Sequence, residues 1–269
     1  YRFSTAVDMS QWYQVVVARD YPIEKFFDSP GFMGSVEREK AIVLYFEKND
    51  EVLTRLKGLD FSIISDGNWV EKWREYFVPV KAGIFTIVPP WKDDSGNLII
   101  NPSRGFGTGH HETTRLSLKL IQDCLENDSN INSMLDVGTG SGILSIGASK
   151  MKPGLDIVAI DNDRDAIDNA FENLVLNDLI EKITVSDTPV FKFTREFDLV
   201  VANIISSVLF SMSEEFKRLS SKWLILSGIL DSESDTFLKR MELDEFELIN
   251  TVQDNEWLGY LLKRRKNER

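Results

Sequence analysis

Residues 136–142 read Asp-Val-Gly-Thr-Gly-Ser-Gly, and this stretch decides the fold that the sequence predicts. A strand-like run at 133–137 leads into it, and Ile143, Leu144 and Ile146 begin a helix after it. Glycines at such a turn let the backbone bend sharply and approach a ligand, and the free N–H groups at the start of the helix favour a negatively charged group. The sequence therefore predicts a nucleotide-type cofactor at the end of the first strand of an α/β domain.

The spacing of the glycines narrows the kind of cofactor. A dinucleotide fingerprint, G-x-G-x-x-G, would have its third glycine at position 143, but Ile143 stands there and the third glycine is Gly142. Asp161 ends the second strand, where an acid can accept hydrogen bonds from both ribose hydroxyls. The pattern G-x-G-x-G, with Asp136 before it and Asp161 after it, resembles the class I S-adenosylmethionine-dependent methyltransferases. This resemblance implies S-adenosylmethionine as the cofactor, and an NAD site or a glycine turn without a ligand remain alternatives.

From about residue 112 onward, strand-like runs alternate with helical stretches. The runs are at 133–137, 156–160, 182–185, 199–202 and 223–226. This alternation is typical of βα units in a parallel sheet, and residues 245–251 and 256–263 add an antiparallel hairpin. One of the helices has Asp163 as its cap, and we expect its apolar stripe to face the sheet. The stripe consists of Ala166, Ile167, Ala170, Phe171, Leu174 and Val175.

The N-terminal part predicts a separate, smaller α+β unit. Strand-like runs occur at 12–17 and 41–46, and Val52, Leu53, Leu56 and Leu59 have helical spacing. An aromatic-faced helix from Asn68 and two short strands, at 84–88 and 98–100, lie among prolines and a turn. We therefore expect a first domain at 1–62, a linker helix and strands at 63–100, and the cofactor-binding domain at 101–269.

Three further motifs identify a closer resemblance. They are residues 106–114 (Phe-Gly-Thr-Gly-His-His-Glu-Thr-Thr), 201–204 (Val-Ala-Asn-Ile) and 226–230 (Leu-Ser-Gly-Ile-Leu). Together with the glycine loop and Asp161 they resemble the PrmA family over about residues 68–265. The first motif differs from the usual family pattern, because His110 stands in place of a threonine and Glu112 in place of a proline.

The resemblance to PrmA implies a function and a set of site residues. Members of that family methylate amino groups of ribosomal protein L11, and their fold is a class I methyltransferase Rossmann-like sheet with a ferredoxin-like N-terminal domain that recognises the substrate. The expected cofactor-binding residues are Thr114, Gly138, Gly140, Asp161 and Asn203, with Phe106 and Thr108 from the polar stretch before the first helix. We expect Asn203 also to position the target amine, because it ends the fourth strand at the edge where ligands of open α/β folds bind.

The methyl transfer itself requires few catalytic side chains. Because it is an in-line displacement, the enzyme mainly aligns the reacting groups and excludes water, and no general base is assigned. His110 and His111 are expected to be loop residues rather than proton carriers, and Cys124 to be a core residue. Two other interpretations remain open: a class I methyltransferase that acts on another protein, a small molecule or RNA, and a cofactor-binding regulatory module.

Composition and charge limit the kinds of partner and the cell compartment that we expect for this protein. The chain has 269 residues and a formal net charge of −12, which argues against naked nucleic acid as a stable partner and favours a basic protein or a small molecule. Most of the acidity lies between residues 81 and 262. One cysteine excludes an internal disulfide, and two adjacent histidines make no Cys/His metal site. With no long apolar run and no signal-peptide pattern, we expect a cytoplasmic protein, and we also expect it to be a monomer without a metal.

Overall fold

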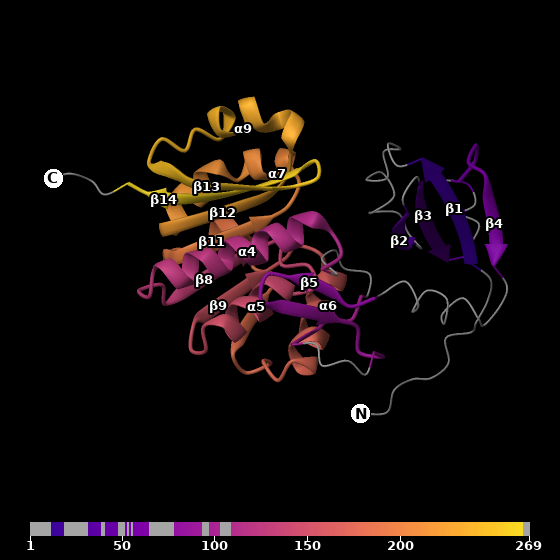
Figure 1. Cartoon of the computed structure of the whole chain (residues 1–269), viewed down its shortest axis with the longest axis horizontal. Helices are drawn as coiled ribbons and strands as arrows, with labels where there is room; N and C mark the ends of the chain where they lie inside the picture. Colours follow the sequence, from indigo (N-terminus) through magenta and orange to yellow (C-terminus); the bar gives the residue numbers. More distant parts are fainter. Residues whose placement is uncertain are drawn as a thin grey trace. The chain divides into compact units, whose positions relative to one another are not determined.

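The computed structural model describes residues 12–18, 32–38, 41–47, 52, 54, 56–64, 78–92, 97–102 and 109–265. The chain divides into two compact units, with the boundary between Val78 and Pro79. Figure 1 colours the chain from indigo at the N-terminus to yellow at the C-terminus. Each unit has its own hydrophobic core among the described residues.

The first unit contains a four-stranded antiparallel sheet in the order β2-β3-β1-β4. Its strands are β1 (Trp12–Ala18), β2 (Phe32–Arg38), β3 (Ala41–Glu47) and β4 (Phe61–Ile64). The strands predicted at 12–17 and 41–46 are confirmed as β1 and β3. Alternate residues of β1 pack with the segment after β3, and the buried residues are Tyr13, Val15, Val17, Leu44, Val52 and Leu56. The predicted helix at Asn68 and the expected loop residues Phe106 and Thr108 lie outside the described residues.

The second unit begins with a small three-stranded sheet, β5-β6-β7. Its strands are β5 (Val80–Ala82), β6 (Phe85–Val88) and β7 (Leu98–Ile99). The strands predicted at 84–88 and 98–100 are confirmed as β6 and β7, whereas β5 was not predicted, and all three belong to the second unit rather than to a linker. Phe85, Ile87 and Leu98 are buried in the same core as the helices of the large sheet. Their apolar side chains therefore place this segment inside the second unit, which the turn residues around it did not indicate.

The main sheet has seven strands in the order β10-β9-β8-β11-β12-β14-β13. The strands are β8 (Ser133–Val137), β9 (Asp156–Ile160), β10 (Ile183–Ser186), β11 (Phe197–Asn203), β12 (Ser220–Leu230), β13 (Phe246–Asp254) and β14 (Trp257–Arg264). The first five are parallel, and β14 pairs antiparallel with both β12 and β13. The predicted parallel sheet with a C-terminal antiparallel hairpin is therefore confirmed.

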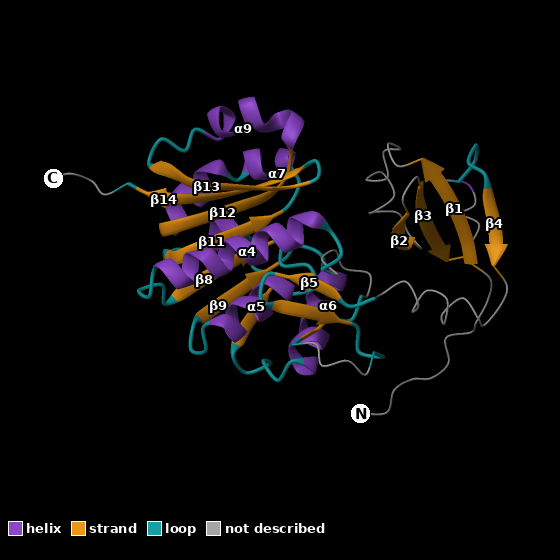
Figure 2. Ribbon diagram, viewed as in Figure 1, coloured by secondary structure: helices purple, strands orange, loops and turns teal. Residues whose placement is uncertain are grey.

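Helices cover both faces of this sheet, as Figure 2 shows in purple. On one face lie α4 (Glu112–Asn127), α5 (Ile143–Met151) and α6 (Arg164–Leu176), and on the other lie α7 (Ser206–Ser211), α8 (Ser213–Leu219) and α9 (Ser234–Met241). Two short 3₁₀ turns, η1 (Val190–Lys192) and η2 (Asp231–Glu233), follow β10 and β12. Successive strand residues alternate between the two cores: Met134 packs toward α4 and α5, whereas Leu135 packs toward α7 to α9.

The stripe predicted for α6 is only partly correct. Asp163 caps the helix by accepting a hydrogen bond from the N–H of Asp165, as expected. Phe171 and Val175, however, are 39% and 60% exposed. Three buried asparagines, Asn169, Asn173 and Asn177, occupy part of the inner face instead, because their amides find backbone partners there.

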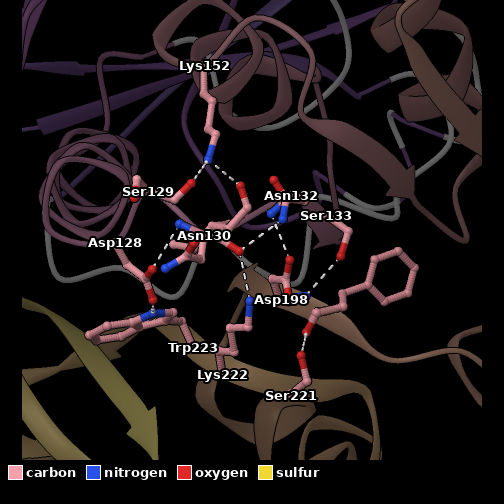
Figure 3. A network of polar contacts seen from close by, with 12 residues as sticks. Asp128, Ser129, Asn130, Asn132, Ser133, Lys152, Asp198, Ser221, Lys222 and Trp223 are labelled. Carbon is pink, nitrogen blue, oxygen red and sulfur yellow. Dashed lines mark hydrogen bonds and ion pairs between the residues drawn. The ribbon is translucent and has the colours of Figure 1, made fainter.

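A polar network fastens the amino ends of the parallel strands (Figure 3). Asp198 accepts a hydrogen bond from the N–H of Asn132 at 2.7 Å and pairs with Lys222 at 2.9 Å. Trp223 donates its indole N–H to Asp128 at 2.8 Å, and Lys222 also donates to the carbonyl of Asn130. These contacts tie the turn between α4 and β8 to β11 and β12, and the hydrogen bonds lower the pKa of both Asp128 and Asp198.

Candidate active site

The glycine loop, residues 138–142, folds back on the end of β9. The N–H groups of Gly138 and Thr139 both donate to the carbonyl of Ile160, at 2.9 and 3.0 Å. All three glycines of the loop have positive φ, at 73°, 55° and 79°. Residues with a side chain adopt this region rarely, so the sharp turn between β8 and α5 requires glycine.

Asp161 follows β9 and holds the loop from the side. Its Oδ2 accepts a hydrogen bond from the N–H of Gly140 at 2.9 Å, and its Oδ1 accepts one from the N–H of Asp163 at 3.1 Å. A carboxylate oxygen can accept two hydrogen bonds, so both oxygens keep capacity for a further donor. This geometry suits the two hydroxyls of a ribose.

Asp136 lies beneath the same loop with one unsatisfied oxygen. Its Oδ2 accepts hydrogen bonds from the hydroxyls of Thr139, at 2.8 Å, and Ser145, at 2.7 Å. Its Oδ1 is buried and finds no hydrogen-bond partner in the part of the chain that the structure describes. Burial raises the pKa of Asp136 to about 6, although the two hydroxyls oppose the shift. A buried acceptor without a donor indicates a ligand group that donates to it.

Thr114 is a second buried residue of this kind. It lies in the first turn of α4, fully buried, with its N–H bonded to the carbonyl of His111. Its Oγ1 also has no partner among the described residues. His111 caps α4 by accepting from the N–H of Thr113, and its ring lies 4.9 Å from that of Trp257. His111 therefore has a structural role at the start of this helix.

Asn203 ends β11 beside the glycine loop. The alternation along β11 puts it on the face of the sheet that α4 and α5 cover, the same face as Asp136. The next residue, Ile204, packs so closely over the loop that a Cβ on Gly138 would lie 2.5 Å from its Cγ2. The carboxyl ends of β8, β9 and β11 thus bring Gly138, Asp161 and Asn203 to one edge.

Two buried asparagines that the sequence did not single out fasten neighbouring segments to α6: Asn173 within the helix and Asn177 just after it. Asn173 donates to the carbonyl of Ser141 in the glycine loop at 2.9 Å and accepts from the N–H of Asn101 at 2.7 Å. Asn177 bonds both the N–H and the carbonyl of Ile99. Their spacing of four residues on a buried helix face is the signal that could have found them, since buried amides need partners.

The residues present fit S-adenosylmethionine. Asp161 suits its ribose, and the unsatisfied Oδ1 of Asp136 suits a cationic or N–H donor group under the loop. The N-terminus of α5 suits a carboxylate, because the helix dipole is positive there. Among the described residues there is no group of three or more metal-ligating side chains, and no helix is long and apolar enough to span a membrane.

Comparisons with known proteins identify a family. The family model described as ribosomal protein L11 methyltransferase (PrmA) matches residues 10–265. The ribosomal protein L11 methyltransferase of Desulfotalea psychrophila is 38% identical over 220 residues, covering 77% of this chain and 72% of that protein. The one from Pelobacter propionicus is 31% identical over 254 residues, covering 84% and 82%.

A solved structure agrees with these sequence matches. The crystal structure of ribosomal protein L11 methylase from Lactobacillus delbrueckii subsp. bulgaricus matches with a TM-score of 0.64 and 26% identity, covering 71% of this chain and 100% of that one. Since the family model covers nearly the whole chain, the protein belongs to the ribosomal protein L11 methyltransferase (PrmA) family and is an S-adenosylmethionine-dependent methyltransferase.

Proposed function

We propose that this enzyme transfers methyl groups from S-adenosylmethionine to lysine or N-terminal amino groups of ribosomal protein L11. The observation that carries the proposal is the convergence of Gly138, Asp161 and Asn203 at one edge of the sheet, in a chain of this family. When bound, S-adenosylmethionine supplies a methyl group activated by its sulfonium.

The chain's own residues bind and orient the reactants. Asp161 accepts hydrogen bonds from the ribose, and the backbone of Gly138 and Gly140 lets the cofactor approach closely. Thr114 and Asp136 provide buried acceptors, and Phe106 and Thr108 complete the cofactor contacts. The match of Thr114, Gly138 and Asp161 to the family pattern supports these roles, and so do the hydrogen bonds of Asp161 and the unpartnered buried oxygens of Asp136 and Thr114.

Asn203 positions the target amine. A lysine has a pKa near 10.4, so a neutral amine at pH 7.4 costs about 4 kcal/mol, and a carboxylate against it would increase that cost. The carboxamide of Asn203 can orient the nitrogen without adding charge. Within the described residues its side chain makes no hydrogen bond, which leaves it available to a substrate.

We also propose how the enzyme recognises its substrate protein, where it works and in which oligomeric state. Residues 1–62 recognise the substrate protein, and the acidic second unit attracts the basic ribosomal protein at long range. The enzyme works in the cytoplasm as a monomer and forms no stable complex with nucleic acid.

The test uses the full chain, methyl-labelled S-adenosylmethionine and an extract from cells that lack this enzyme. A single labelled protein band, which co-migrates with purified L11 and is absent with Asn203→Ala, is the expected result. Label in RNA or in a small metabolite would overturn the assignment in favour of another methyltransferase class. Binding of the cofactor without any transfer would favour a regulatory module.

A further inference from the structure

Two glycines, Gly138 and Gly228, lie in close contact with Ile204, the residue that follows Asn203. Besides the contact of Ile204 with Gly138, the backbone of Ile204 lies against Gly228 in β12: a Cβ on Gly228 would be 2.8 Å from the carbonyl carbon of Ile204. Real Cβ atoms are essentially never this close to other heavy atoms, so no other residue at 228 leaves Ile204 in place.

A bulge in β12 makes this contact possible. The pairing of β12 with β14 shifts register between Ser227 and Ile229, which leaves Gly228 as the extra residue, with φ at 87°. On its other side β12 pairs with β11 without a register shift from Leu199 to Asn203, and Asn203 lies opposite Ser227. The bulge therefore sits beside the end of β11 and accepts the backbone of the next residue.

Glu233 holds the far end of the same segment. Its Oε1 accepts a hydrogen bond from the hydroxyl of Ser206 at 3.0 Å, and its Oε2 accepts one from the N–H of Leu230 at 3.4 Å. Ser206 is the first residue of α7, and Glu233 ends the turn η2. The segment 204–206 is thus held at one end by Gly228, near the carboxyl end of β12, and at the other by Glu233 in η2.

We infer that Gly228 and Glu233 are positioning residues for methyl transfer, which act through the segment 204–206 on Asn203. This inference rests on the proposed role of Asn203. Neither residue touches the reactants; they fix the backbone on which the carboxamide is mounted. A displacement of about 1 Å in a reacting geometry can reduce turnover about a hundredfold, so small shifts of this segment matter.

The main test compares Gly228→Ala with Gly154→Ala. Gly154 has a similar φ, at 94°, but a Cβ at this position would meet nothing within 4 Å, so it controls for backbone strain alone. In Gly228→Ala we expect kcat on L11 to fall at least about tenfold, while the Kd of S-adenosylhomocysteine, which also depends on Asp161, rises by a smaller factor. Gly154→Ala keeps kcat within about twofold. Equal kcat values in the two variants overturn the inference.

A second set of variants decides the matter if Gly228→Ala does not fold. Loss of one hydrogen bond in Glu233→Ala lowers kcat about fivefold, and Glu233→Gln, which keeps an acceptor oxygen for Ser206, restores it to within about twofold. Asp231→Ala removes a carboxylate from the same turn without touching Ser206 and serves as the control. Wild-type kcat in Glu233→Ala, or no recovery in Glu233→Gln, contradicts the inference.

A readout independent of turnover separates this inference from the proposed function. If the wild-type chain methylates no L11, the proposed function fails. The positioning of Asn203 by Gly228 and Glu233 is then tested by NMR of the side-chain amides in the presence of S-adenosylhomocysteine. The Asn203 signal, assigned by its absence in Asn203→Ala, should shift in Glu233→Ala and stay in place in Asp231→Ala. An Asn203 signal that stays in place in both variants overturns the inference.

Discussion

The two edges of the seven-stranded sheet use their polar groups in opposite ways. At the amino edge the side chains of Asp198, Lys222 and Asp128 all have partners inside the protein, as the network in Figure 3 shows. At the carboxyl edge Asp136 and Thr114 keep buried oxygens without a partner in the described chain. One edge completes the fold, whereas the other leaves hydrogen-bonding capacity for a ligand, and each prediction below tests that division.

The largest expected effect is the opposite pH response of the two edges. Asp136 has a folded pKa of about 6 against an ordinary value of 3.8, so the folded state holds its proton more tightly, and lowering the pH stabilises it. The lowered pKa values of Asp128 and Asp198 have the opposite consequence: their contribution is present above the unfolded pKa and is lost as the pH falls.

Asp136→Asn isolates the contribution of Asp136 to the pH dependence of stability. Relative to the variant, the wild type should gain on the order of 3 kcal/mol in free energy of unfolding as the pH falls from 8 to below 4, with about half of it present at pH 5. Urea unfolding of both proteins at each pH measures the difference. If the difference in free energy of unfolding between the two proteins does not change with pH, the pKa of Asp136 is not raised in the folded state, and the prediction is wrong.

The second prediction concerns turnover at the carboxyl edge. Asn203→Ala should lower kcat on L11 about a hundredfold, because the amine loses the group that we propose orients it. The fold should persist, since the side chain bonds no described residue. Steady-state kinetics at saturating cofactor measure the effect, and Asn130→Ala, at the amino edge, serves as the matched asparagine. Equal losses in the two variants would refute the separation of the edges.

The third prediction concerns affinity. Asp161→Ala removes the acceptor of two backbone N–H groups and the proposed acceptor of the ribose, so the Kd of S-adenosylmethionine should rise about thirtyfold, or about 2 kcal/mol. Asp161→Asn keeps one acceptor oxygen and should lose less. Calorimetric titration with S-adenosylmethionine gives both values. Unchanged affinity in Asp161→Ala would show that the ribose binds elsewhere.

The sequence predicted local features of both edges and missed the long-range ones. The strands at 133–137 and 156–160 follow from their apolar runs, and Gly138 and Asp161 follow from spacing along the chain. The stripe on α6 failed at Phe171 and Val175, because the partners of Asn173 and Asn177 are residues some seventy positions away. Sequence periodicity carries no information about such contacts.

Long-range contacts also decided the position of the predicted linker and the role of the motif at 226–230, and the sequence could not show them. Turn residues between 78 and 100 suggested a connection, but Phe85 and Leu98 are core residues of the second unit. The motif at 226–230 supported a family resemblance without a physical role. Its glycine acquires one only when the fold brings Ile204 against Gly228.

The smallest expected effect lies at the amino edge. Asp198→Ala removes the acceptor of the Asn132 N–H and the partner of Lys222, and the side chains of Asp198 and Lys222 are 18% and 38% exposed. Because the pair is partly open to solvent, we expect the free energy of unfolding to fall by only about 1 kcal/mol. The Kd of S-adenosylmethionine and kcat should both stay within about twofold, since the network lies at the opposite ends of the strands from Asp161. Urea unfolding and the same titration check both statements, and a clear loss of affinity at unchanged stability would mean that the two edges are coupled through the strands between them.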